Sequence, residues 1–153
     1  MERGNLTVFS YQGHTERIAQ KIAEETGGDL FAIRSVNPYP GYDECLDVAN
    51  AEKENNARPA FEGGVENMAD YDVVFIGYPI WWYDAPMIAL TFLESYDLSG
   101  KTVIPFATSG GSSLEVSLDS VRASAVGATI GEGILANDES DVAPWITGLG
   151  YAK

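Results

Sequence analysis

Cysteine and histidine are almost absent from this chain of 153 residues, which contains only Cys45 and His14. A single cysteine cannot form an internal disulfide, and one histidine without a cysteine cluster cannot build the usual zinc sites. The only histidine lies in a turn that we assign below to ligand binding, so a Ser-His-Asp site is excluded as well. We therefore expect neither catalytic residues of the hydrolase type nor a bound metal.

Basic residues are also scarce, because nine Lys and Arg stand against 23 Asp and Glu, which gives a net charge of −14 at pH 7. Binding to a nucleic acid backbone requires a basic face, so we expect no nucleic acid partner. The acidic charge has two interpretations that the sequence leaves open. It maintains solubility, or it steers the chain toward basic surfaces of partner proteins.

Long apolar runs are missing too. No run approaches the roughly 18 residues that would predict a membrane span. Residues 1–4 lead straight into an apolar segment, without the charged start, apolar stretch and cleavage site of a secretion signal. We expect a cytoplasmic protein that does not bind membranes, and its length fits a single domain over residues 1–153.

Short apolar runs that favour strands alternate with helical patterns along the chain. Strands are predicted at residues 6–10, 30–36, 72–78, 102–107 and 129–135, the last one interrupted by Gly131 and Gly133. Helices are predicted at residues 14–26, 43–56, 84–95, 112–125 and 141–149. In the fourth helix, Leu114, Leu118, Val121 and Ala125 share a face. This alternation predicts an α/β protein with a parallel sheet. Right-handed crossovers leave few topologies, among them the five-stranded doubly wound order 2-1-3-4-5 with helices on both faces.

Ligands of an open parallel sheet bind beyond the carboxyl ends of its strands. The loop after the first strand is rich in hydroxyl and amide groups and runs into a helix, whose unpaired N–H groups suit phosphate. An ordinary helix-capping turn is the alternative, and neither Gly-Lys-Ser/Thr nor G-x-G-x-x-G is present. The candidate phosphate residues are Ser10, Tyr11, Gln12, Gly13, His14 and Thr15.

The loop after the third predicted strand contains three consecutive aromatic residues. Consecutive aromatics on a loop cannot all point inward, so at least one is expected to stack on a flat ligand, although core packing is the more ordinary role. The candidate residues here are Pro79, Ile80, Trp81, Trp82 and Tyr83.

The loop after the fourth strand combines glycines, which allow close backbone approach, with small hydroxyls that can bond polar ring edges. Its residues are Thr108, Ser109, Gly110, Gly111 and Ser112, and an ordinary turn before a helix is the alternative. In the order 2-1-3-4, the three loops leave neighbouring strands. Together they predict a site for a phosphorylated planar aromatic, and FMN fits that description best.

At these loops the chain resembles the flavodoxin family. S-Y-Q-G-H-T at residues 10–15 is similar to the flavodoxin phosphate loop, and G-Y-P-I-W-W at 77–82 and F-A-T-S-G-G-S at 106–112 resemble a short-chain subfamily common in bacteria. The resemblance implies a flavodoxin-like fold and non-covalent FMN, with phosphate on the first loop and the ring between the other two. Two departures stand out: Gln12 replaces the usual threonine, and Tyr83 replaces a glycine whose backbone commonly reorients on reduction.

This family resemblance implies a low-potential one-electron carrier between redox proteins that have basic docking surfaces. Carboxylates near the ring would lower the reduction potential, and Asp84 and Glu115 are candidates. The chain would act as a monomer or weak dimer and would not itself be an enzyme. The alternative is an FMN-dependent NAD(P)H oxidoreductase acting on quinones, and a third hypothesis is a binding module that no longer carries FMN.

Overall fold

The computed structural model describes residues 4–8, 14–33, 42–64, 68–80, 85–108, 113–136 and 138–151. None of the helices in these ranges is long and apolar enough to cross a membrane. The elements are β1 (Gly4–Val8), α1 (His14–Thr26), β2 (Asp29–Ala32), α2 (Tyr42–Glu54), η1 (Met68–Asp70), β3 (Val73–Pro79), α3 (Met87–Glu94), β4 (Thr102–Thr108), α4 (Glu115–Ser124), β5 (Thr129–Ile130), β6 (Ile134–Leu135), η2 (Glu139–Asp141) and α5 (Val142–Leu149).

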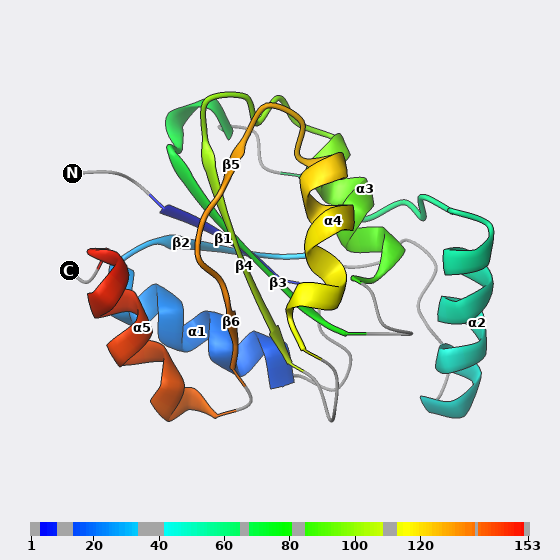
Figure 1. The fold of residues 1–153 in the computed structure, drawn as a ribbon, viewed down its shortest axis with the longest axis horizontal. Helices are drawn as coiled ribbons and strands as arrows, with labels where there is room; N and C mark the ends of the chain where they lie inside the picture. Colours follow the sequence, from blue (N-terminus) through cyan, green and yellow to red (C-terminus); the bar gives the residue numbers. More distant parts are fainter. Residues whose placement is uncertain are drawn as a thin grey trace.

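These strands form one parallel sheet with the order β2-β1-β3-β4-β5, and β6 also pairs with β4. Helices α1 and α5 cover one face of the sheet, and α3 and α4 cover the other (Figure 1). Helix α2 lies outermost, beside α3. The predicted α/β fold with helices on both faces of a parallel sheet is confirmed.

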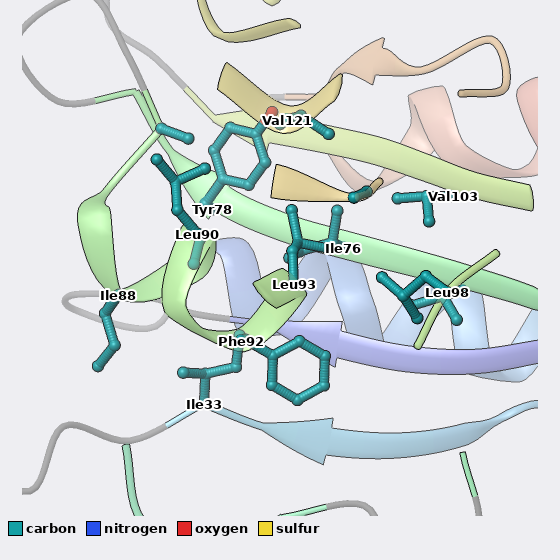
Figure 2. Packing of buried hydrophobic residues seen from close by; sticks show 14 of the residues in the cluster. Ile33, Ile76, Tyr78, Ile88, Leu90, Phe92, Leu93, Leu98, Val103 and Val121 are labelled. Atoms are coloured by element: carbon teal, nitrogen blue, oxygen red, sulfur yellow. The ribbon is translucent and has the colours of Figure 1, made fainter. Parts of the chain in front are cut away.

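Strand β3 is buried on both faces because it lies in the middle of the sheet. Ile76 and Tyr78 point into the cluster under α3 and α4, where Ile76 lies near Leu93 and Val103 (Figure 2). Val73 and Phe75 point to the opposite face, into a cluster that includes Ile18, Ile22 and Ile146. A strand covered on both sides gains nothing from alternating polar residues, which explains its uninterrupted apolar sequence.

The predicted fifth strand, residues 129–135, is interrupted at its two glycines as expected, because β5 and β6 are separate segments and Gly131 and Gly133 lie between them. On β4, Val103 pairs with Ile130 and Phe106 pairs with Ile134. Two residues separate the paired positions on β4, but three separate them on the edge segment, so the edge segment contains one extra residue. Carbonyl oxygens of Lys101, Val103 and Ala107 accept hydrogen bonds from this edge segment. Every second residue of β4 turns its backbone groups toward this edge, and Pro105 is one of them. Its nitrogen therefore faces the edge segment but carries no hydrogen to donate, so the hydrogen-bond ladder breaks there.

Two further features fit the break between β5 and β6. Gly133 passes so close to β4 that a Cβ atom on it would lie 2.2 Å from the Pro105 carbonyl oxygen. On the outer side, the Trp145 indole N–H donates to the Glu132 carbonyl oxygen over 3.1 Å. The glycine thus permits the close approach, and the α5 tryptophan supplies a partner that a continuous ladder would otherwise provide.

Helix α4 buries most of the predicted face, because Val121 and Ala125 are buried and Leu114 packs against the core, whereas Leu118 is only half-buried. Two serines that were not predicted to face the core, Ser117 and Ser124, are buried as well. Both serines have hydrogen-bond partners in the structure: Ser117 bonds Tyr78 over 2.8 Å, and Ser124 donates to the Glu94 carboxylate over 2.8 Å. These partners allow polar side chains on the core side of the helix.

Gly77 of β3 makes room for the ring of Phe106, which is fully buried on the neighbouring strand. A Cβ atom at Gly77 would lie 2.2 Å from Phe106 Cε2. We expect Gly77→Ala to lower the free energy of unfolding by about 1–3 kcal/mol, as overpacking does. Gly148→Ala is the control, because nothing lies within 4 Å of its added Cβ and the site is helical. Gly148→Ala should raise the free energy of unfolding by up to about 1 kcal/mol. Urea titration of both variants measures the two changes, and equal effects would contradict the close approach of Gly77 to Phe106.

Candidate functional site

The carboxyl ends of three neighbouring strands meet at one edge of the sheet. Val8, the last residue of β1, pairs with Gly77 of β3, and Pro79 at the end of β3 pairs with Thr108 at the end of β4. The three loops singled out in the sequence follow these strand ends. Because β1, β3 and β4 are adjacent, the loops leave from a single rim, which is the arrangement that ligand sites of open α/β sheets use.

A side-chain hydrogen bond joins the first loop to the third. Thr15, the second residue of α1, is 1% exposed, and its hydroxyl lies 3.0 Å from the hydroxyl of Thr108, which is 93 residues away in the sequence. Either oxygen can be the donor. The direction of the bond can therefore adapt to a hydrogen-bond acceptor placed on either side of the pair.

Thr108 also holds the second loop. Its carbonyl oxygen accepts a hydrogen bond from the Ile80 N–H over 2.9 Å, which extends the β3–β4 ladder by one residue past Pro79. Thr108 thus contacts the start of the second loop through its backbone and the first turn of α1 through its side chain. One residue therefore connects the end of the first loop with the starts of the other two.

The first turn of α1 contributes a helix N-terminus to this rim. Its leading N–H groups have no partners within the helix, and the positive end of the helix dipole favours an anion there. Glu16 and Arg17 carry opposite charges in the same turn, so their side chains add no net charge. The turn combines N–H donors with the buried Thr15 hydroxyl, which is the chemistry that binds a phosphate group.

The structure describes only part of the predicted site. Thr15, Pro79, Ile80 and Thr108 are described in full, with Pro79 and Ile80 half-buried, and His14 is described in its backbone. Hydrogen bonds bring Thr15, Ile80 and Thr108 together. The other predicted residues lie outside the described ranges: Ser10, Tyr11, Gln12, Gly13, Trp81, Trp82, Tyr83, Ser109, Gly110, Gly111 and Ser112.

The surface beside the third loop is acidic. Glu115 and Asp119 are exposed on the first turns of α4, and Val116 between them is 40% exposed. Asp138, which follows β6 and caps η2, accepts hydrogen bonds from Ser140 that lower the pKa of its carboxyl group. These carboxylates give the rim a negative potential. Within the described residues, no group of three or more His, Cys, Asp or Glu side chains could hold a metal ion.

Sequence reasoning missed two polar residues directly behind the rim. The hydroxyls of Tyr78 and Ser117 lie 2.8 Å apart, and both residues are fully buried. Nothing in the sequence pattern indicates that these two side chains form a hydrogen bond. Tyr78 lies in an apolar strand, and Ser117 lies 39 residues later in a helix that also contains a leucine. Only the fold brings them together.

Comparisons with known proteins agree with this geometry. A flavodoxin family model matches residues 5–149. A Bacteroides eggerthii protein provisionally described as a flavoprotein is 39% identical, with a TM-score of 0.89 over 98% of this chain and 99% of that one. A similar Bacteroides uniformis protein is 35% identical, with a TM-score of 0.87 over 95% of this chain and 98% of that one. No protein of curated function matches.

A more distant structure is a flavoprotein from Lactobacillus acidophilus, which was crystallised in complex with FMN. It is 21% identical and has a TM-score of 0.80, covering 95% of this chain and 99% of that one. At this identity the likeness shows a shared fold. The family model spans nearly the whole chain, and the parallel sheet presents its loops at one rim. This chain therefore belongs to the flavodoxin family.

Proposed function

We propose that this chain binds FMN at the carboxyl edge of β1, β3 and β4 and acts as a low-potential one-electron carrier between redox proteins. The observation that carries the proposal is the pair of hydrogen bonds through which Thr108 joins Thr15 and Ile80. They connect a helix N-terminus suited to phosphate with the two loops predicted to hold a ring. The FMN complex of the Lactobacillus acidophilus flavoprotein, which has the same fold, supports the choice of ligand.

The residues present fit a phosphorylated flavin. The phosphate would be held by the first loop, residues 10–15, where Thr15 and the leading N–H groups of α1 offer hydrogen-bond donors. The ring would lie between the loops at 79–83 and 108–112, with Trp81 or Trp82 as the stacking residue. No basic side chain is needed, because direct donors dominate an anion's local energy while distant carboxylates are screened.

FMN, when bound, supplies the redox chemistry, and the protein supplies shape and electrostatics. A carboxylate about 10 Å from a redox centre, at an effective dielectric near 20, disfavours an added electron by about 1.7 kcal/mol, or about 70 mV. Exposed Glu115 and Asp119 flank the third loop, and Asp84 lies in the sequence just after the second. Several such charges would make the carrier a low-potential reductant.

The partners we propose are redox proteins with basic docking surfaces, met briefly by a monomer or weak dimer. A net charge of −14 supports long-range attraction to such surfaces. Exposed Val116 between two carboxylates supplies apolar contact beside the rim. A chain with one cysteine needs no oxidising compartment, which supports a cytoplasmic location.

Thr108→Val tests the link between the loops, because it removes the hydroxyl and keeps the side-chain shape and the backbone bond to Ile80. A hydrogen bond worth about 1 kcal/mol predicts an FMN dissociation constant raised about fivefold. Quenching of FMN fluorescence measures it. Thr108→Ser should restore most of the affinity.

Thr102→Val, the same change at the opposite end of β4, is the matched control and should leave FMN binding unchanged. If the two valine variants bind FMN equally well, Thr108 does not organise the site.

A further inference from the structure

A buried polar contact lies in the apolar core just behind the proposed flavin site. Tyr78 and Ser117 are both 0% exposed, and their hydroxyls are 2.8 Å apart. The Ser117 hydroxyl also donates to the Leu114 carbonyl oxygen over 2.8 Å. Figure 2 shows the Tyr78 ring rising from β3 with its oxygen on the side of α4, among Leu90, Ile76 and Val121.

The chain positions of the two residues give this contact its significance. Tyr78 is the next-to-last residue of β3 and directly precedes the predicted aromatic loop at 79–83. Ser117 is the third residue of α4, which begins three residues after the predicted Gly/Ser loop at 108–112. The hydrogen bond therefore joins the end of β3, which leads into the loop at 79–83, to the start of α4, which follows the loop at 108–112.

Packing alone does not explain a tyrosine here. Its neighbours in the cluster are almost all apolar, so phenylalanine would fill the same space without burying two hydroxyls. A buried hydroxyl pair is favourable only in one relative placement of β3 and α4, since any slip leaves both groups without this partner. Such a contact specifies position more strongly than apolar packing does.

We propose that Tyr78 and Ser117 are positioning residues that set the spacing between the two loops flanking the flavin ring. The inference rests on the proposed function, since the ring loops have this role only if the chain binds a flavin. The hydrogen bonds of Ser117 to Tyr78 and Leu114 connect β3 with α4, and neither element leads into the first loop. The contribution of the pair therefore concerns the ring end of the ligand and leaves the phosphate end unaffected.

Tyr78→Phe and Tyr71→Phe form a matched test. Tyr71 is 3% exposed and precedes the same strand, and its hydroxyl donates to the Asp29 carboxylate at the opposite, amino edge of the sheet. Both variants remove a phenol hydrogen bond, buried at Tyr78 and partly buried at Tyr71, with little change in side-chain volume. We expect Tyr78→Phe to raise the dissociation constants of FMN and riboflavin by the same factor, about fivefold, and Tyr71→Phe to change neither by more than about twofold.

Amide hydrogen exchange of the flavin-free protein provides a second readout. The Ile80 N–H donates to Thr108 and the Ser117 N–H donates to Leu114, so both amides report on the loop starts. Tyr78→Phe should speed exchange at both amides, relative to the amides of β1, and Tyr71→Phe should not. If Tyr78→Phe fails to fold, Ser117→Ala removes the same contact from the helix side and carries the same expectations.

The outcomes separate this inference from the proposed function. Wild-type protein that takes up no flavin overturns the proposed function, and the exchange data still test the spacing of the loop starts. Wild-type protein that binds FMN while Tyr78→Phe binds it equally well overturns the inference. Equal losses of affinity in Tyr78→Phe and Tyr71→Phe also overturn it, because they would reflect general destabilisation. A double variant, Tyr78→Phe with Ser117→Ala, should lose no more affinity than either single variant, and additive losses would contradict a shared contact.

Discussion

Purified protein should bind one FMN per chain and should prefer FMN to riboflavin by at least about 100-fold. The two ligands share the ring and differ by the phosphate, so the ratio of their dissociation constants isolates the first loop. Two or more charge-assisted hydrogen bonds to phosphate, each worth about 1.5–3 kcal/mol, account for a factor of this size or larger. Fluorescence quenching of each flavin, titrated with flavin-free protein, gives both constants.

Thr15→Val should reduce this preference, because Thr15 contributes a buried hydroxyl to the first loop. We expect FMN binding to weaken at least about tenfold more than riboflavin binding, which loses only the effect of the Thr15–Thr108 bond that Thr108→Val also removes. The control is Thr26→Val at the other end of α1, where the hydroxyl donates to the Ile22 carbonyl oxygen. That variant should lose some stability and keep the preference. Equal affinity of the wild-type protein for both flavins would remove phosphate binding from residues 10–15.

Local signals predicted the helices and strands well where the deciding contacts are themselves local. Helix α1 has the predicted bounds, His14–Thr26. Its end is fixed by Gly27, whose φ of 74° is the left-handed conformation that glycine adopts readily, and by the Thr26 hydroxyl, which bonds back to Ile22. Helix α2, Tyr42–Glu54, differs from its prediction by one residue at the start and two at the end.

Predictions were incomplete where a neighbouring strand or helix decides. The glycines within residues 129–135 predicted an interruption, but they could not reveal that Pro105 on β4 turns its backbone nitrogen toward the break. Helix α4 presents Ser117 and Ser124 to the core because Tyr78 and Glu94 are placed to receive them. Amphipathic periodicity assigns such positions to solvent, since it takes no account of a partner elsewhere in the fold.

The site shows the same division. Loop composition after successive strands was enough to predict that three segments meet at one rim, because strand order in a parallel sheet follows from few rules. The bonds that organise the rim were not predictable, since Thr15 and Thr108 are 93 residues apart and each is unremarkable alone. The sequence therefore predicted which strand ends share a rim, and the structure adds the hydrogen bonds that join them.

The carrier and its rival, an NAD(P)H oxidoreductase acting on quinones, differ in what surrounds the flavin. An enzyme must hold nicotinamide against the ring and neutralise the dinucleotide phosphates, which basic side chains usually do. The whole chain has nine Lys and Arg, and Lys101 is at the amino edge, where its ammonium donates to the Tyr71 carbonyl oxygen. The described residues flanking the third loop on α4 are acidic instead. This charge distribution favours protein partners over dinucleotides.

We accordingly expect slow direct reduction of the FMN-loaded protein by NADH or NADPH, at least about 100-fold slower than through a separate NADPH-dependent flavodoxin reductase with a basic face. Stopped-flow absorbance of the flavin measures both rates. Raising ionic strength from about 0.1 M to about 1 M shortens the Debye length from about 10 Å to about 3 Å, and should slow the reductase-mediated rate at least about tenfold.

Charge variants decide whether the acidic rim causes this salt dependence. Replacing exposed Glu115 and Asp119 by Gln and Asn should lower the association rate and flatten its dependence on salt, because both carboxylates lie beside the third loop. The matched control replaces Glu24 and Asp72, exposed at the amino edge, and changes net charge by the same amount. Its effect should be several-fold smaller, since steering depends on where the charges lie. Rapid, saturable oxidation of NAD(P)H by the isolated protein, insensitive to salt and to both double variants, would decide for the enzyme.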